Sequence, residues 1–415
     1  MAFSRREGMK TCVRLALAAL LAIVFTDAEP AHVSVVEGGD WVSAVLSAPV
    51  QSTVLFGPGT YSGCPSEGLA IPTNVSLVGS RGAASTTIDC QGAGRHFRIG
   101  SDGIATSVLV RGLTLTGGVA PGDTGAGGCI LANGSSASVL VTVEDSSLSE
   151  CSAALGGAIA VIGSAAANIH NSTLQQNTAD EDGGGIYVTT NSVVTVIRSK
   201  LIGNVAGGTG GAMHVDTNSL VNMSEGVRVL QNQAGSHGGG VSAEDSTVEL
   251  LQDVEFRENK AKGTTADGGA LDLQSSILRA AGNIIMSGNY AGDDGGALKV
   301  YKSQVTFVDN IVMHDNHCED NGGAIYAYSS SAVHIRRGAS FTDNMAEDNG
   351  GAIYLTSGTN CELTDSVEFI GNVAGNVRIP TPFHPGFTVR LGSSEQIHQT
   401  TPCFEDSRVG KTQFA

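Results

Sequence analysis

The stretch FTDNMAEDNGGAIYLT, residues 341–356, contains two signals that decide the fold of this chain. The first is an apolar residue, Phe341, followed three positions later by Asn344 and two positions after that by Ala346. The second is the pair Gly350-Gly351, followed by a small residue and then by aliphatic residues at alternate positions. Alternation of this kind is typical of a strand with one buried face.

Both signals recur along the chain at nearly constant spacing. The Gly-Gly signal occurs nine times at intervals of 27 to 30 residues, with its first glycine at Gly127, Gly156, Gly183, Gly210, Gly238, Gly268, Gly295, Gly322 and Gly350. The Asn signal runs in phase with it, at Asn177, Asn204, Asn232, Asn259, Asn289, Asn316, Asn344 and Asn372. Self-similarity with such a period indicates a solenoid of stacked coils.

Each repeat is predicted to form one coil of three short strands joined by three turns. Ile186-Tyr187-Val188 follows one Gly-Gly pair and reads as the first strand, Val248 and Leu250 lie in a second strand, and the apolar residue before each Asn lies in the third. Stacking puts like residues above like residues at about 4.8 Å, so the main-chain hydrogen bonds run between coils. The predicted fold is an all-β, single-stranded parallel β-helix of about 27–30 residues per coil.

The two signals are assigned to structure rather than to chemistry. The eight asparagines are predicted to form an internal ladder, in which each amide bonds the turn backbone and the Asn of the next coil. The glycines are predicted to take positive φ at a sharp corner, where the residue that follows must also be small.

Four segments follow from the extent of the repeat: a leader at 1–28, an N-terminal cap at 29–51, a β-helix at 52–376 and an irregular C-terminal tail at 377–415. The leader has a basic start and an apolar run from Leu15 to Phe25 that is too short to span a bilayer, which predicts a signal peptide rather than an anchor. We therefore expect a secreted, extracellular or cell-surface protein with no transmembrane span in the mature chain.

The cap is expected to contain a short amphipathic helix from Asp40 to Leu46. Trp41 and Val45 lie on one face of this helix, which would seal the open end of the core. The β-helix behind it should have eleven or twelve coils.

The chain is acidic, and this limits its partners. Its net charge is −17, and loss of the leader lowers the charge to −19. An acidic exported protein is a poor partner for nucleic acid and repels polyanionic glycans unless cations intervene. The many near-identical coils instead favour an extended face that binds a glycan or a cell-surface protein.

Eight cysteines become seven once Cys12 is removed with the leader, so at least one thiol stays unpaired or is shared between chains. Cys64 and Cys90 are the best candidates for a disulfide. Three further cysteines occupy small or buried positions of the repeat and are interpreted as core substitutions: Cys129, Cys318 and Cys361.

The repeat units resemble those of a known family. The segments FRENKA (256–261), FTDNMA (341–346) and FIGNVA (369–374), with GGAI at 322–325 and 350–353, resemble the repeats of chlamydial polymorphic outer membrane proteins. Pro58-Gly59-Thr60-Tyr61 resembles the start of pectate-lyase-like β-helices. The resemblance covers about four-fifths of the chain and implies a right-handed parallel β-helix with an adhesive role. The family's C-terminal barrel is not expected here, because about 40 residues follow the last coil.

The search for a catalytic site uses the outward positions after each Gly-Gly pair, which are Ala160, Tyr187, His214, Ser242, Asp272, Lys299, Tyr326 and Tyr354. Asp272 and Lys299 are interpreted as a cross-strand charge pair, and His214 is expected beside Tyr187 without a carboxylate. We find no cluster of ionisable side chains on adjacent coils, so no catalytic residue and no cofactor is predicted. A polysaccharide lyase, hydrolase or epimerase is the alternative, because this fold also hosts such enzymes.

Acidic residues precede the Gly-Gly corners and are expected to form a ridge along one edge. Its members include Asp182, Asp267, Asp294, Asp320 and Asp348. Like charges at this spacing repel, so either water and salt screen the ridge or Ca²⁺ bridges it.

Four asparagines begin an Asn-x-Ser/Thr sequon: Asn74, Asn133, Asn171 and Asn222. They either carry glycans on the N-terminal half or arise by chance in a chain rich in Ser, Thr and Asn. Glycans there would leave the C-terminal coils, with their tyrosines, as the contact surface.

Overall fold

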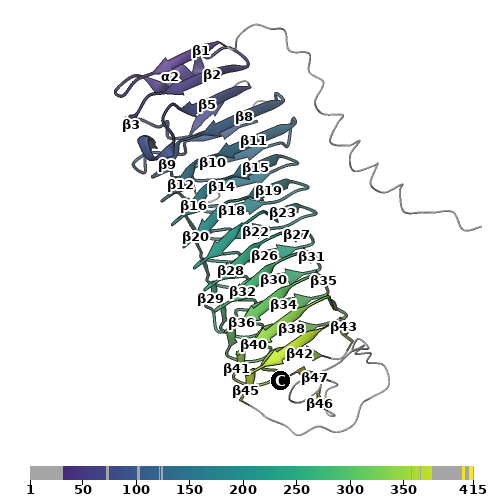
Figure 1. The fold of residues 1–415 in the computed structure, drawn as a ribbon. Coiled ribbons are helices and arrows are strands. Elements are labelled where there is room, and N and C mark those ends of the chain that lie inside the picture. The colour runs from purple at the N-terminus through teal and green to yellow at the C-terminus, as the bar shows by residue number, and fades with distance from the viewer. Residues whose placement is uncertain are drawn as a thin grey trace, which may run out of the picture. The chain divides into compact units, whose positions relative to one another are not determined.

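The computed structural model describes residues 31–375, except 72–73, 101–102, 121, 123–124, 357 and 365, and also describes 404–406 and 411–414. The predicted signal peptide at 1–28 lies outside the described residues. Within them the chain forms an all-β parallel solenoid of about 12 turns, which confirms the predicted right-handed β-helix. The coils stack in chain order, from the purple to the yellow end of the ribbon in Figure 1.

Each coil contributes one strand to each of several parallel sheets. Sheet 1 runs from β1 (His32–Val35) to β43 (Asn360–Thr364), and sheet 3 runs from β3 (Gly59–Tyr61) to β44 (Val367–Ile370). Sheet 2 carries the residues that follow the Gly-Gly corners. Its parallel strands are β4 (Leu69–Ile71), β7 (Phe97–Ile99), β10 (Ile130–Asn133), β14 (Ile159–Ile162), β18 (Ile186–Val188), β22 (Met213–Val215), β26 (Val241–Glu244), β30 (Leu271–Gln274), β34 (Leu298–Tyr301), β38 (Ile325–Tyr328) and β42 (Ile353–Thr356).

A regular coil contains four strands, not the three that were predicted. One coil consists of β18, β19 (Val193–Ile197), β20 (Lys200–Ile202) and β21 (Val205–Ala206). The fourth strand has two residues and pairs with its equivalents in a fourth sheet, from β13 (Ser152–Ala153) to β45 (Val373–Ala374). Two residues are too few to show alternation, so the sequence pattern does not reveal this strand.

The register keeps the phase of the sequence repeat. Leu148, which precedes Cys151, and the apolar residues before the eight asparagines form one continuous column along sheet 3: Leu174, Leu201, Val229, Phe256, Met286, Met313, Phe341 and Phe369. The first glycine of every pair has φ between 64° and 74°, as predicted. At the second position a Cβ on Gly296 would lie 2.2 Å from the carbonyl oxygen of Gly323, so any side chain there would collide with the next coil.

The Asn ladder is present from Asn177 to Asn372. At Asn259, Nδ2 donates to the carbonyl of Val229 at 2.9 Å and to Oδ1 of Asn289 at 3.0 Å. Its Oδ1 accepts from the backbone N–H and Nδ2 of Asn232 at 3.0 and 2.9 Å. Each interior asparagine therefore uses its whole amide to join three coils.

The cap contains the expected helix, α2 (Trp41–Leu46), which buries Trp41 and Val45. Asp40 caps it, because its Oδ1 accepts the N–H of Ser43 at 3.0 Å. Trp41 packs edge-on against Phe97 of β7, with 6.2 Å between the ring centroids. The helix thus covers the first end of the core.

The other end of sheet 2 is formed by part of the tail that was predicted to be irregular. Strands β46 (Phe404–Asp406) and β47 (Lys411–Phe414) form an antiparallel pair, and β47 also pairs antiparallel with β42. No helix among the described residues is long and apolar enough to cross a membrane.

Candidate functional site

The outward residues of sheet 2 form one column, in the order that the sequence predicts. Backbone pairing aligns Ala160, Tyr187, His214, Ser242, Asp272, Lys299, Tyr326 and Tyr354 on successive strands from β14 to β42. The Gly-Gly corner fixes this alignment, because it starts each strand at the same point of the coil. Several of these side chains are buried, because residues from the corner lie against them.

Lys299 is the centre of a buried ionic cluster. Its Nζ lies 2.9 Å from Oδ1 of Asp272 and 3.5 Å from Oδ2 of Asp267, and the residue is only 4% exposed. Burial alone would lower the pKa of Lys299, but the two carboxylates outweigh it and raise that pKa above its ordinary value. The expected charge pair with Asp272 is therefore present, and the ridge residue Asp267 joins it.

Four tyrosines continue this face toward the last coils, and we call them the tyrosine face: Tyr301, Tyr326, Tyr328 and Tyr354. Ring centroids of neighbouring members are 4.8 to 5.8 Å apart, and the rings of Tyr326 and Tyr354 are stacked. Tyr354 is buried and the other three are half-buried. Lys299 lies 5.8 Å from the ring of Tyr301 and 5.9 Å from that of Tyr328, so the two groups are continuous.

A second polar cluster surrounds His214, and here the prediction was wrong. A carboxylate does accompany the histidine, because Asp216 Oδ2 lies 3.8 Å from its Nε2. Thr209 Oγ1 lies 2.7 Å from Nδ1, and the ring stacks on Tyr187 at 5.4 Å. Burial raises the pKa of Asp216, but hydrogen bonds with His214 and two threonine hydroxyls outweigh it and bring that pKa to about 2.

Ionisable side chains thus do gather on adjacent coils, contrary to the sequence-based expectation. The reason is the tight Gly-Gly corner, which brings the residue before it against the outward face of the strand after it. Thr209 and His214, five residues apart, meet in this way. The sequence analysis treated the corner residues and the outward residues as two sets and did not predict that they meet.

The predicted acidic ridge divides into two columns. Asp182, Asp267 and Asp294 directly precede the glycines, and each Oδ1 accepts the backbone N–H of the equivalent residue in the next coil, at 2.7, 3.1 and 2.9 Å respectively. Asp320 and Asp348 lie one position earlier, and the N–H of Asp348 donates to the carbonyl of Asp320 at 2.9 Å. Much of the ridge therefore serves as a hydrogen-bond ladder between coils.

One group on the ridge has the composition of a cation site. Carboxylate oxygens of Asp267, Asp293 and Asp294 lie within 4.8 Å of one another. Burial, with the neighbouring charges of Asp267 and Asp293, raises the pKa of Asp294 to about 7, although hydrogen bonds from Asn321 oppose this. Oxygen ligands of this kind suit Ca²⁺.

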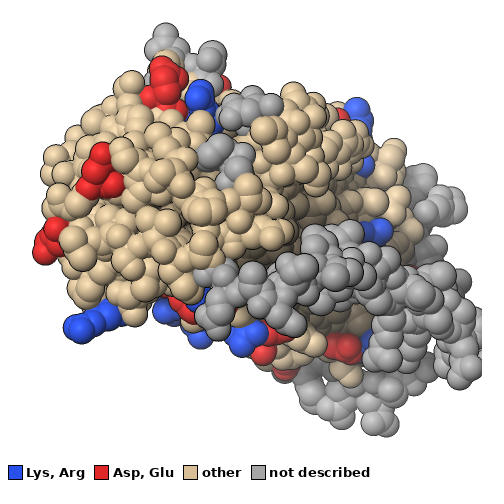
Figure 2. All heavy atoms as spheres, turned by 90° about the horizontal axis from the view of Figure 1, so that it is seen from above, with Lys and Arg blue, Asp and Glu red and all other residues tan. Residues whose placement is uncertain are grey.

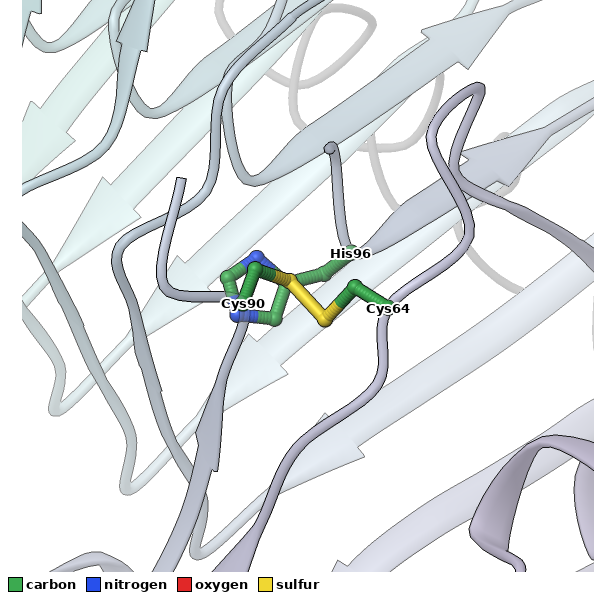
Figure 3. A group of neighbouring side chains, drawn as sticks. All are labelled: Cys64, Cys90 and His96. Carbon is green, nitrogen blue, oxygen red and sulfur yellow. A yellow bond between two sulfur atoms is a disulfide. The ribbon is translucent and has the colours of Figure 1, made fainter. Parts of the chain in front are cut away.

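A third group lies in the first coils. Cys64 and Cys90 form the predicted disulfide. Cys129 is not a plain core substitution, because it forms a second disulfide with Cys151. His96 lies next to both pairs, and Figure 3 shows the Cys64–Cys90 disulfide in front of its imidazole ring. Cys318 and Cys361 are buried in later coils, as the repeat predicts.

The sequon asparagines differ in exposure. Asn171 is exposed, with its Nδ2 donating to Asp145 Oδ1 at 2.6 Å, whereas Asn74, Asn133 and Asn222 are half-buried. Glycosylation stays a prediction at all four. Figure 2, which views the molecule from above, shows both acidic and basic side chains around the rim of this face.

The sequence analysis missed Tyr301, Tyr328, Asp216 and His96. The first three stand two positions after an outward residue, so alternation along the strand could have revealed them. His96 carried no such signal, because Gly94-Arg95 stands at the corner where later coils have the Gly-Gly pair.

Comparison with known families is consistent with this architecture. Residues 184–375 match the right handed beta helix region, and residues 171–189 match the Chlamydia polymorphic membrane protein repeat. No curated protein and no solved structure shows a significant match to the chain.

Proposed function

We propose that this chain, a right-handed β-helix with a Chlamydia polymorphic membrane protein repeat, is a secreted or surface-displayed binding protein that recognises a glycan or a cell-surface protein without catalysing a reaction. The repeat match supports a surface role, because the matching family is one of membrane proteins. The right-handed β-helix gives a rigid support for an extended contact surface.

The observation that carries this proposal is the tyrosine face. Tyrosines are favoured at binding surfaces because they supply a large contact area, lose little side-chain entropy and offer a hydroxyl for hydrogen bonding. Here Tyr301, Tyr326 and Tyr328 are half-buried, so their positions are fixed while part of each ring stays accessible.

The ionic cluster beside these rings suits binding better than proton transfer. Lys299 is held between two carboxylates, and its pKa is raised, so it stays protonated at neutral pH and cannot act as a base. Asp267 and Asp272 are in turn used to neutralise it. The cluster thus fixes the face on which the tyrosines lie.

A binding experiment with matched variants tests the proposal. Acidic and neutral polysaccharides are incubated with the protein, and both the retained protein and the polymer length are measured. We expect retention on at least one polymer without shortening, loss of retention in Tyr326→Ala, and no change in Tyr290→Ala. Tyr290 is the control because it is also half-buried but lies in the fourth sheet, in β33 (Tyr290–Ala291). Shortened polymer would contradict the proposal.

A polysaccharide-cleaving enzyme is the second candidate, and one observation favours it. Asp294, with a pKa of about 7, lies beside Asp293 and Asp267, and a carboxyl group with a raised pKa near a second carboxylate is one feature of glycosidase sites. Polymer shortening that is lost in Asp294→Asn, but kept in Asp180→Asn at an exposed carboxylate, would establish this candidate.

The same three carboxylates are the ones we propose for Ca²⁺, which would separate like charges on the ridge. Bound Ca²⁺ should raise the melting temperature, since a ligand that binds only the folded state stabilises it. The increase should disappear in Asp293→Asn and remain in Asp180→Asn. An equal increase in both variants would mean that the cation acts elsewhere.

A further inference from the structure

The Asn ladder does not extend into the first coils, where other residues occupy its positions. The N–H of Cys151 donates to Oδ1 of Asn177 at 3.0 Å, in the way that each ladder asparagine bonds the next. Cys151 is therefore the ladder position of its coil. Pairing of β9 (Thr114–Thr116) with β12 (Ser147–Ser149) places Gly118 at the same position one coil earlier.

His96 fills the space that Gly118 leaves. A Cβ on Gly118 would lie 2.7 Å from Nδ1 of His96, so the imidazole stands where a ladder side chain would otherwise be. Nε2 of His96 lies 2.9 Å from the carbonyl oxygen of Ile88. A carbonyl can only accept, so in the tautomer in which Nε2 donates to Ile88, Nδ1 presents a lone pair.

In the disulfide-bonded fold this lone pair accepts no hydrogen bond from a described residue. His96 is 0% exposed, and its Nδ1 has no hydrogen-bond partner among the described residues. A buried acceptor without a donor destabilises the protein and calls for an explanation.

Both disulfides of the first coils lie close to this ring. One ring nitrogen of His96 and the sulphurs of Cys64 and Cys90 lie within 4.8 Å of one another (Figure 3), and the same holds for His96 with Cys129 and Cys151. Structural zinc sites have four ligands, which are thiolate sulphurs and neutral imidazole nitrogens.

We propose that the thiol form of this chain binds one thiophilic divalent cation through Cys64, Cys90 and Nδ1 of His96, with one sulphur of the Cys129–Cys151 pair as the fourth ligand. The cation and the disulfides are alternatives, because they use the same sulphur atoms. In the thiol form the cation would hold together the first coils, which lack the Asn ladder.

Exchange between the two forms requires reduction. A dithiol gives two electrons and two protons to the Cys64–Cys90 bond and becomes a disulfide itself, whereas a phosphine gives two electrons and becomes the phosphine oxide with oxygen and two protons taken from water. Each route yields two thiols, and the second disulfide is reduced in the same way. The cation then displaces the proton of each ligating thiol, and the imidazole, already neutral, releases none. A small-molecule disulfide takes two electrons from each cysteine pair by thiol–disulfide exchange and is itself reduced to two thiols, which restores the protein disulfides and releases the cation.

The test uses the purified full chain with Co²⁺ as a spectroscopic probe and Zn²⁺ as competitor. The phosphine-reduced protein should bind one equivalent of Co²⁺ with thiolate-to-cobalt absorption, and Zn²⁺ should displace it. The disulfide-bonded protein should bind none at this site. We expect Cys64→Ser/Cys90→Ser to abolish the absorption. We expect His96→Gln to weaken binding by at least about tenfold, because it removes a ligand and even the loss of a residue that only orients a ligand costs that much.

Cys318→Ser is the matched control, because Cys318 is also a buried cysteine but lies in the fourth sheet, and it should leave binding unchanged. If a ligand variant fails to fold, alkylation of the reduced wild-type chain replaces it: Zn²⁺ should protect Cys64 and Cys90 and leave the labelling of Cys318 unchanged. Equal binding by the reduced and disulfide-bonded proteins, or no protection of Cys64 and Cys90, would overturn the proposal.

Discussion

The side chain of Lys299 is almost fully buried, and its charge is stable there only because two carboxylates face it. Removal of one partner from a buried ion pair leaves the remaining charge without compensation. The ionic cluster is therefore a point at which single substitutions should have large effects, although it lies on the outward face of a sheet.

Lys299→Met should destabilise the protein by about 3 kcal/mol, because it leaves Asp272 and Asp267 buried without a counter-charge. Urea unfolding measures the change in the free energy of unfolding. Lys302→Met is the control, since Lys302 is exposed and lies over the ring of Tyr301, and it should cost less than about 1 kcal/mol. Equal effects would show that the cluster contributes little.

Asp294 should make stability depend on pH. Its pKa is about 7 in the folded protein and close to 3.8 when unfolded, so the folded state holds a proton that the unfolded state has lost. The protonated Asp294 carboxyl therefore imposes no penalty on the free energy of unfolding below pH 4. As pH rises toward 7, the unfolded state ionises more readily than the folded state and the free energy of unfolding falls. Asp294→Asn should gain stability relative to the wild type across this window. Asp180→Asn, at an exposed carboxylate, should show no such trend in thermal melts.

At the scale of elements, the ladders hold the turns in register while the strands supply the pairing. The Asn ladder has a counterpart in serines that the sequence analysis overlooked: the N–H of each of Ser219, Ser246, Ser276 and Ser303 donates to the hydroxyl of the next serine in the series. Both ladders satisfy buried turn backbone that no strand can reach.

Asn259→Ala should cost about 3 kcal/mol, because it leaves the carbonyl of Val229 and the N–H of Asn232 without their partners. The free energy of unfolding from denaturant titration measures this cost. Asn360→Ala provides the comparison, since Asn360 is exposed at the start of β43, and it should change stability by about 0.5 kcal/mol or less. Similar losses in the two variants would argue against the ladder.

The strands and the Asn ladder could be predicted because each coil repeats the same sequence pattern. The spacing of the Gly-Gly and Asn signals shows which residues of successive coils are equivalent, and equivalent residues stack. The sites could not be predicted in the same way, since they depend on how the corner folds back onto the sheet, as Asp267 does onto Lys299. The group around His96 was also hidden, because its coils replace the repeat signals with Cys151 and Gly118.

At the scale of the whole molecule, each coil contacts chiefly its neighbours, so stability is close to a sum of local terms. The register pairs Ile186 with Met213 and Val188 with Val215, which means that one coil is a complete unit of the stack. Deletion of a whole coil should therefore preserve the fold, whereas deletion of part of a coil should not.

Deletion of 186–212, one full coil, joins Gly185 directly to Met213 and keeps every column in phase. We expect this variant to fold, with a smaller denaturant m-value because less surface is exposed on unfolding. Deletion of 186–198, about half a coil, should abolish cooperative unfolding, because it moves core residues out of their columns. Circular dichroism during denaturation distinguishes the two outcomes.

Strand β47 runs opposite to β42, whereas every other pairing along sheet 2 up to that point is parallel. A sheet edge with free N–H and C=O groups is a template for another molecule, and natural proteins block such edges. Beyond β47 the sheet ends with β46, so the strand of the last coil, β42, does not present a free edge. At this end of sheet 2 the hairpin of β46 and β47 therefore covers the edge that the coils of another molecule could otherwise extend.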